Sequence, residues 1–179
     1  MSNLRYAQFY SEAVAMRHGE PRIDLLLQVL DGAFLARGWQ GATLSGAVRG
    51  LTPRQALWRP GAGRHNIWEL MLHTAYWKHI VRQRIEGRAE REAFPRRGRN
   101  FPDLPVRCDA AAWRADVALL KAEHARLKRC VEGLGGRLDT RVGASRWTVA
   151  ESVYGVAAHD LYHTGQIQLL RALARRRAR

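Results

Sequence analysis

Two histidines four residues apart, His159 and His163, are the residues of this chain best suited to bind a metal ion. In a helix this spacing is just over one turn, so both imidazoles project from one face with their Cβ atoms about 5 to 6 Å apart. Two ring nitrogens so placed can hold one ion. Because the chain has 7 histidines in 179 residues, about 0.23 such pairs would arise by chance, and the surroundings must supply further evidence.

The sequence around this pair predicts a helix whose histidines face the protein interior. An apolar stripe with three- and four-residue steps runs through Val149, Ser152, Val156, His159, His163, Ile167 and Leu170. Two stacked imidazoles in a dry environment would each need a polar partner. A bound metal ion would satisfy both.

A third ligand is required, because two side chains from a single turn hold an ion only weakly. His73 is the leading candidate. Residues 66–81 have a helical pattern, and Leu70, Trp77 and Ile80 are the helical neighbours of His73 on its face. We therefore expect His73 to point inward as well.

The segments from Trp68 to Trp77 and from Tyr154 to Ile167 closely resemble the DinB/YfiT-like superfamily, and the likeness extends over nearly the whole chain. In that superfamily, one histidine of the second bundle helix and a His-x-x-x-His pair of the last helix hold a divalent metal. The resemblance places these ligands on His73, His159 and His163.

The resemblance also implies a range of functions. Characterised relatives include thiol-dependent transferases and isomerases, so it implies a metal-dependent reaction of a small electrophilic substrate with a low-molecular-weight thiol. The alternative is a non-catalytic metal-binding stress-response protein, because the sequence shows no acid, base or nucleophile outside the ligands. Imidazole ligands do not distinguish Zn, Ni, Fe or Mn. Relatives often dimerise through bundle faces, which favours a homodimer.

Hydrophobic periodicity predicts four long helices, over residues 21–37, 66–87, 109–132 and 148–175. Pro21 suits a first helical position. Asn66 with Glu69, and Thr148 with Glu151, have the spacing of capping boxes.

The faces of these helices follow from the same periodicity. The apolar face of the first is expected to comprise Leu25, Leu26, Val29, Leu30 and Ala33. The third has an apolar seam formed by Trp113, Val117, Leu120, His124, Leu127 and Val131. The solvent-exposed face of the second is expected to carry Arg82, Arg84 and Glu86.

The fold predicted from these elements is an all-α four-helix bundle of antiparallel or crossover type. Short extra helices are expected over residues 44–49 and 53–58, and another over residues 2–18 outside the bundle. Residues 88–108 contain three prolines and must be a loop that crosses from one end to the other beside a bundle opening.

Length and composition favour one domain over residues 1–179, with residues 1–18 as an N-terminal extension and 172–179 as a basic tail. No apolar run reaches the roughly 18 residues of a membrane span, and the N-terminus lacks an apolar signal core, so a cytoplasmic protein is expected.

The net charge of +14 raises nucleic acid as a partner, but its distribution argues against one. Only three of the 30 cationic residues are lysines, and the arginines are spread over most segments instead of forming one stripe with interleaved aromatics. Cys108 and Cys130 lie 22 residues apart without a Cys-x-x-Cys pattern, so we expect reduced, structural thiols.

The remaining histidines are assigned to structural roles. His18, His65 and His79 are expected at the surface or at helix caps. His124 lies on the inward seam, where a satisfied core histidine is favoured over a fourth ligand or a residue that orients a ligand.

Several neighbours of the histidines have two interpretations. Tyr162 and Gln166 lie one turn from the ligand pair and either orient bound water or substrate, or pack in the core. Asp160 projects about 100° from His159, so it would need a ligand of another helix as its partner. Trp68 and Trp77 are expected in the core, with contact to substrate as the minor alternative.

Overall fold

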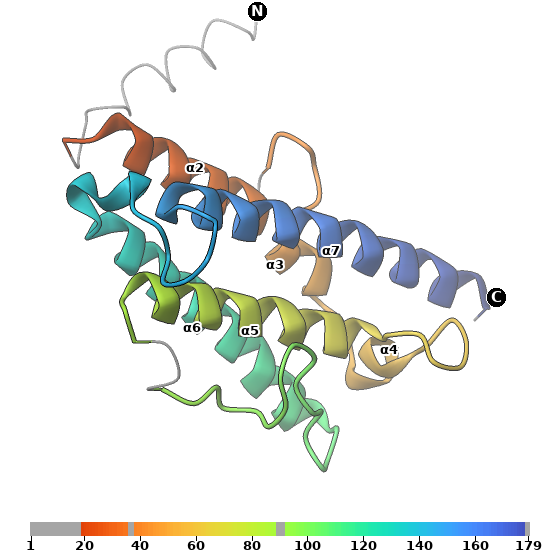
Figure 1. Ribbon diagram of the computed structural model, residues 1–179. Coiled ribbons are helices and arrows are strands. Elements are labelled where there is room, and N and C mark those ends of the chain that lie inside the picture. The colour runs from red at the N-terminus through yellow and green to blue at the C-terminus, as the bar shows by residue number, and fades with distance from the viewer. Residues whose placement is uncertain (1–18, 36–37, 89–91, 178–179) are drawn as a thin grey trace, which may run out of the picture.

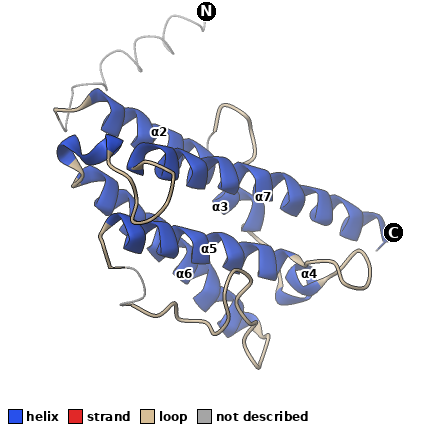
Figure 2. Ribbon diagram, viewed as in Figure 1, coloured by secondary structure: helices blue, strands red, loops and turns tan. Residues whose placement is uncertain are grey.

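The computed structural model describes residues 19–35, 38–88 and 92–177, and within them it is helical, with two isolated β-bridges and no strand (Figure 2). This confirms the predicted all-α class. The expected helix over residues 2–18 lies outside the described residues. Every described helix is too short or too polar to cross a lipid bilayer.

Four long helices form the bundle and shorter helices cover it (Figure 1). The long helices are α2 (Pro21–Phe34), α5 (Ile67–Ile85), α6 (Ala110–Glu132) and α7 (Val149–Arg177). The short ones are α3 (Leu44–Val48), α4 (Pro53–Leu57) and the 3₁₀ helix η1 (Gly135–Asp139). Only η1 has no counterpart in the prediction.

Side-chain caps fix where the two site-bearing helices begin. At α5, Glu69 N donates to Asn66 Oδ1 over 2.9 Å and Asn66 N donates to Glu69 Oε2 over 3.1 Å. At α7, Thr148 N donates to Glu151 Oε2 over 2.7 Å and Glu151 N donates to Thr148 Oγ1 over 3.2 Å. Both predicted capping boxes are thus present, and each satisfies backbone groups that a helix end leaves unpaired.

The directions of the helices follow from residues that meet across them. His73 lies opposite His163 and Lys78 opposite Asp160, so α5 and α7 run antiparallel. Trp68 meets Trp113 at the start of α5 and α6, and both helices run in the same direction. In the resulting ring, α5 packs on α6 and α7, and α2 packs on the same two helices.

The segment between α5 and α6 must return along the bundle, because the two helices are parallel neighbours. Its described residues form neither helix nor strand. In Figure 1 this segment, in green, passes along the outside of α5 and α6. The crossing loop is therefore as predicted, and of the two bundle types that the sequence left open the structure is the crossover type.

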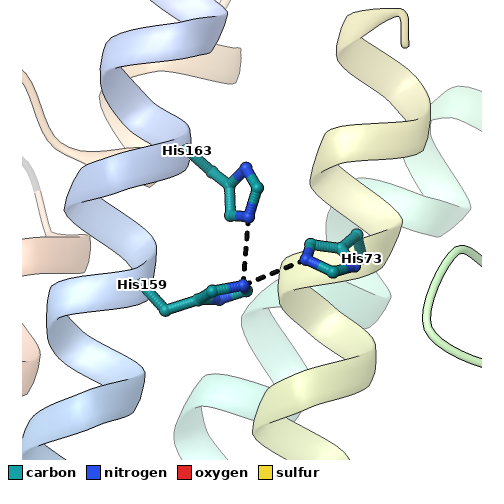
Figure 3. Close-up of side chains that lie close together, drawn as sticks. All are labelled: His73, His159 and His163. Atoms are coloured by element: carbon teal, nitrogen blue, oxygen red, sulfur yellow. Dashed lines mark hydrogen bonds between the residues drawn. The ribbon is translucent and has the colours of Figure 1, made fainter.

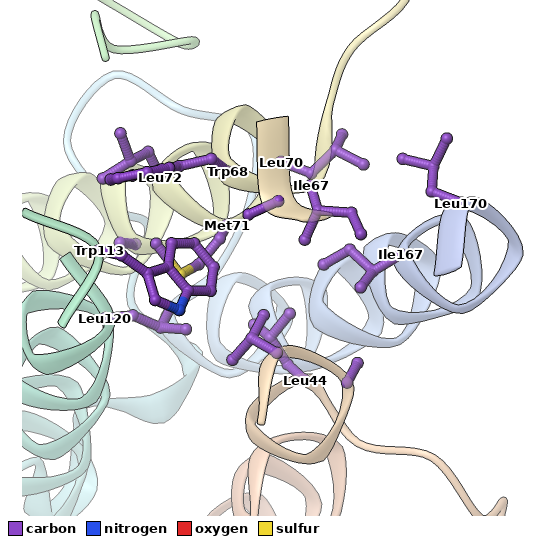
Figure 4. Close-up of a cluster of buried hydrophobic side chains, with 14 of the residues drawn as sticks. Leu44, Ile67, Trp68, Leu70, Met71, Leu72, Trp113, Leu120, Ile167 and Leu170 are labelled. Atoms are coloured by element: carbon purple, nitrogen blue, oxygen red, sulfur yellow. The ribbon is translucent and has the colours of Figure 1, made fainter. Parts of the chain in front are cut away.

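The apolar core has two parts. One lies between the first half of α5, α6, α7 and the short helices, and Figure 4 shows Trp68, Met71, Trp113 and Ile167 within it. The other joins α2 to the last turns of α6 and the first turns of α7. Burying each Leu- or Ile-sized side chain contributes about 1.5–3 kcal/mol, so these contacts hold the bundle together.

Two expectations for the first helix are wrong. Helix α2 ends at Phe34 instead of Arg37, and Leu25 is 58% exposed instead of facing the core. The buried stripe has steps of three and four residues and comprises Ile23, Leu26, Leu30, Ala33 and Phe34. Leu25 is one residue, or about 100°, away from Leu26 around the helix, so it faces solvent.

His79 and Arg82 are also buried, contrary to the prediction that they are exposed. The His79 ring lies with Nε2 2.9 Å from the Glu92 carbonyl oxygen and Nδ1 3.4 Å from Glu123 Oε2. Arg82 donates to Glu92 Oε2 over 2.8 Å. The crossing loop thus supplies acceptors for polar groups of α5, and α6 places a carboxylate beside them, which makes their burial tolerable.

A fully buried ion pair joins α5 to α7. Both side chains, Lys78 and Asp160, are 0% exposed, and Lys78 Nζ donates to Asp160 Oδ2. Lys78 Nζ also lies 5.3 Å from the centre of the Phe34 ring of α2. Asp160 therefore contacts a cation of another helix, whereas the sequence suggested a histidine ligand as its partner.

Removing one member of this pair should destabilise the protein strongly. We expect Asp160→Ala to lower the free energy of unfolding by about 3–5 kcal/mol, because it leaves a buried ammonium unpaired, while Lys78→Met with Asp160→Leu loses less. Urea denaturation measures both. Asp139→Ala, at a side chain 73% exposed and paired to Arg22, is the matched control and should change stability by less than about 1 kcal/mol. Equal effects at both positions would contradict the prediction.

Candidate metal centre

The structure brings the three predicted histidines together (Figure 3). His73 projects from α5, and His159 and His163 project from adjacent turns of α7. The His159 Nε2 atom lies 3.0 Å from Nε2 of His73 and 3.0 Å from Nε2 of His163. The three side chains each offer one nitrogen, and these nitrogens lie within 4.8 Å of one another.

The outer nitrogens of two rings are held by oxygen acceptors. His73 Nδ1 lies 2.6 Å from the Asn100 carbonyl oxygen, and His163 Nδ1 lies 2.7 Å from Gln166 Oε1. These oxygens only accept hydrogen bonds, so both Nδ1 atoms carry the hydrogen. The lone pairs of His73 and His163 are consequently on Nε2, facing the shared point.

The spacing of these nitrogens suits a bound cation, whereas hydrogen bonds among the three rings alone cannot satisfy all of them. His159 Nε2 can carry a single hydrogen, which cannot serve both neighbouring lone pairs fully. Its Nδ1 is buried and has no hydrogen-bond partner among the described residues. A divalent ion with nitrogen ligands at about 2.1 Å would place neighbouring nitrogens roughly 3.0–3.4 Å apart, which matches the two distances found.

Burial keeps these imidazoles neutral. Loss of hydration lowers the pKa of His73 to about 4 and the pKa of His159 to about 3, and the nearby rings lower both further. Burial also lowers the pKa of His163. All three lone pairs are therefore available at neutral pH, as metal ligation requires.

The crossing loop closes one side of the histidine cluster. Phe101 stacks on His73 with ring centroids 4.1 Å apart, and Trp77 Nε1 donates to Asn100 Oδ1 over 2.9 Å. Asn100 has a φ of 63°, a left-handed conformation that asparagine tolerates better than most residues. Sequence reasoning missed Asn100 and Phe101, although the predicted position of the loop beside the bundle opening pointed to this segment.

A groove of about 830 Å³ begins at the histidine cluster and runs between α5, α7 and the segment before α7. Its polar end is formed by His73, His159 and Asn100. Along its length it is lined by Trp77, Val81, Arg84, Val142, Ser145, Trp147, Glu151, Ser152, Tyr154, Gly155 and Val156. A hollow of this size accommodates a small organic molecule.

The two tryptophans of α5 differ in position. Trp68 is fully buried and its Nε1 donates to Asp116 Oδ2 over 2.8 Å, so it is a core residue as expected. Trp77 is half-buried and lines the groove, which favours the alternative of contact with a ligand.

Gln166 and Tyr162, the two neighbours of the histidine pair, also differ in position. Gln166 orients His163, as described above. Tyr162 is 64% exposed, and its ring centroid lies 4.9 Å from that of His163. It does not line the groove.

The other histidines lie outside the cluster. His124 is buried, its Nε2 lies 3.3 Å from Asp31 Oδ1, and its ring stacks on Phe34, so it is a core residue. Only one of its ring nitrogens is satisfied, because the buried Nδ1 has no hydrogen-bond partner among the described residues. His65 pairs with Glu69 beside the start of α5. His18 lies outside the described residues.

The sequence profile of the DinB superfamily matches residues 37–167, and the chain belongs to this superfamily. The matched region contains all three clustered histidines. No curated protein and no solved structure shows significant similarity to the chain.

Neither cysteine lies at the groove. Cys108 donates to the Pro105 carbonyl oxygen, and Cys130 lies beside the second part of the core. Burial raises the pKa of Cys108, and it raises that of Cys130 to about 11. Both shifts disfavour the thiolate, which is the reactive form.

We expect iodoacetamide at pH 8 to alkylate Cys130 about 100-fold more slowly in the folded protein than in urea-unfolded protein. The reason is that a pKa near 11 leaves only about one thiol in a thousand ionised at pH 8, against roughly one in ten for an unshifted thiol. Peptide mass spectrometry follows each cysteine separately. The rate should rise with pH up to about 11, and equal folded and unfolded rates would show that the shift is absent.

Proposed function

We propose that this protein is a metal-dependent enzyme that acts on a small electrophilic molecule with the help of a low-molecular-weight thiol. His73, His159 and His163 are the proposed ligands of a divalent ion. The observation that carries the proposal is the convergence of three neutral imidazoles at one end of a groove large enough for an organic substrate. Membership of the DinB superfamily supports the same role.

A divalent ion at this point would lower the pKa of a bound thiol or water and so supply a nucleophile near neutral pH. The residues of the chain have complementary tasks. Asn100 and Gln166 hold the outer nitrogens of two rings, which keeps the inner lone pairs aligned. Phe101 and Trp77 limit access of water to the cluster from the side of the loop.

The reactive sulfur in this proposal comes from a cosubstrate. Both cysteines of the chain lie away from the groove and have raised pKa values. In a transfer reaction, the external sulfur would form a bond to the electrophilic carbon, the leaving group would depart with its electron pair, and the thiol proton would pass to solvent. An isomerisation would use the same addition, followed by loss of the thiol.

A second candidate, a non-catalytic metal-binding protein, is favoured by the scarcity of acid–base groups. Glu151 is the one carboxylate among the described residues that line the groove. It is occupied in capping α7, and the hydrogen bonds from Thr148 lower its pKa. Turnover assays separate this candidate from the enzyme.

Metal analysis tests the premise shared by both candidates. Protein purified without a histidine tag should contain about one divalent ion per chain, measured by plasma mass spectrometry. His73→Gln and His159→Gln should each reduce this below about 0.1, because two remaining imidazoles hold an ion weakly. His124→Gln, at a buried histidine of α6 outside the cluster, is the matched control. Equal metal content in the wild type and all variants would refute the proposed site.

Turnover is then measured with glutathione or cysteine and 1-chloro-2,4-dinitrobenzene as the electrophile. The enzyme proposal expects a rate that chelation abolishes and that Zn, Ni, Mn or Fe restores. A protein that holds one ion per chain and turns over no thiol and electrophile pair would instead support the non-catalytic candidate.

Gln166 provides a sharper test, because it contacts a proposed ligand and not the shared point. Gln166→Leu removes the acceptor for His163 Nδ1, and we expect it to weaken metal affinity roughly 10–100-fold. Gln166→Glu retains an acceptor and should preserve most of the affinity. Gln168→Leu, on an exposed position of the same helix, is the matched control. Competition with a metal-sensitive dye measures all four proteins. An unchanged affinity in Gln166→Leu would show that His163 is not oriented by this bond.

A further inference from the structure

We infer that the groove beside the histidine cluster binds an elongated aromatic molecule that carries an anionic group, with the aromatic part between Trp77, Trp147 and Tyr154 and the anion at Arg84. The inference rests on the proposed function, and it specifies the substrate class of the same site.

The aromatic part of the inference follows from unusual exposure. Trp147 is 49% exposed and Tyr154 is 61% exposed, although both are large apolar side chains. They line the groove together with Trp77, which is only half-buried. Exposed aromatic side chains gathered around one hollow are typical of a ligand site. Flat π-systems stack on such rings with a gain beyond simple burial of area.

The anionic part follows from the charges of the lining. Arg84 is the one cationic side chain among the described residues that line the groove, and its guanidinium lies 5.9 Å from the centre of the Trp77 ring. Glu151, the opposing charge, is bound to the backbone and hydroxyl of Thr148. Arg84 is therefore placed to form charge-assisted hydrogen bonds with a carboxylate, sulfonate or phosphate.

The elongated shape follows from the register of α5. His73, Trp77, Val81 and Arg84 follow one another at steps of four, four and three residues, so they lie along one face of the helix. Eleven residues of helix span roughly 16 Å. Because an arginine side chain reaches back by several ångström, a ligand that contacts both ends would separate its reacting group and its anion by roughly 10 Å.

One glycine allows the groove to be filled without disturbing the fold. Gly155 lines the groove, and a Cβ added there meets nothing within 4 Å. Gly165, ten residues further along α7, is equally open but does not line the groove. Leucine at either position replaces a helical glycine and should not weaken the helix. The two substitutions therefore form a matched pair.

The test uses two fluorescent probes with the same aromatic body, anionic 8-anilinonaphthalene-1-sulfonate and neutral N-phenyl-1-naphthylamine, on the full-length protein freed of metal. We expect Gly155→Leu to weaken both probes roughly tenfold and Gly165→Leu to weaken neither. Arg84→Gln should weaken the sulfonate roughly tenfold and leave the neutral probe within about twofold. Arg107→Gln removes the same charge from a side chain 89% exposed outside the groove and should change neither.

Three outcomes would overturn the inference. The first is that Arg84→Gln binds the sulfonate probe as tightly as the wild type does. The second is no loss in Gly155→Leu relative to Gly165→Leu. The third is a change of oligomeric state in Gly155→Leu, seen by size-exclusion chromatography with light scattering, which would make the groove an interface between copies of the chain.

A final arm keeps this inference separate from the proposed metal site. Paramagnetic Ni²⁺ added to the probe-bound protein should quench the fluorescence of the wild type and leave that of His73→Gln bright. Probe discrimination without any metal binding would retain the anionic aromatic site and refute the metal centre. Metal binding without probe discrimination would retain the metal centre and refute the anionic aromatic site.

Discussion

The central feature of the structure is the convergence of three imidazole Nε2 atoms, from two helices, on one point. A hydrogen bond to the outer nitrogen of a ring keeps the ring from rotating or presenting the wrong nitrogen, and two of the three rings are held in this way. The Asn100 carbonyl holds His73, and Gln166 holds His163. One of these acceptors belongs to the crossing loop, which exists because α5 and α6 run parallel. The loop that this bundle topology requires therefore supplies the carbonyl oxygen that orients His73.

A second constraint is the register between α5 and α7. Lys78 and Asp160 pair in the core between the two helices that carry the histidines, and Asp160 directly follows His159. Desolvating two charges is costly, so the pair adds little to stability compared with apolar residues of the same size. A shift of α5 by one turn would separate the charges and would also move His73 by about 5.4 Å. The ion pair thus raises the free energy of any shift of α5 along α7 that would move His73 away from His159 and His163.

Periodicity and capping patterns predicted the fold and the inward faces that carry His73, His159 and His163, because both signals depend on residues close together in sequence. The grouping of His73 with the other two histidines was implied by the resemblance to the DinB/YfiT-like superfamily, and the structure shows the three side chains together. The errors concern contacts with distant segments. His79 and Arg82 appeared exposed because the carboxylates beside them, of Glu92 and Glu123, lie on other elements. Asn100 carried no pattern at all, since a backbone carbonyl can come from any residue of a loop.

Burial has opposite effects on the two kinds of potential nucleophile in this protein. Loss of hydration disfavours the charged form of every group, so it keeps the lone pairs of His73 and His159 free and holds the Cys130 thiol protonated. Burial therefore keeps the imidazole nitrogens able to bind a metal and keeps the chain's own thiols unreactive. A thiolate can form here only beside a compensating cation, and the convergence of the histidines provides one place where such a cation would sit. In the proposed thiol-dependent reaction, the nucleophilic sulfur would therefore have to come from outside the chain.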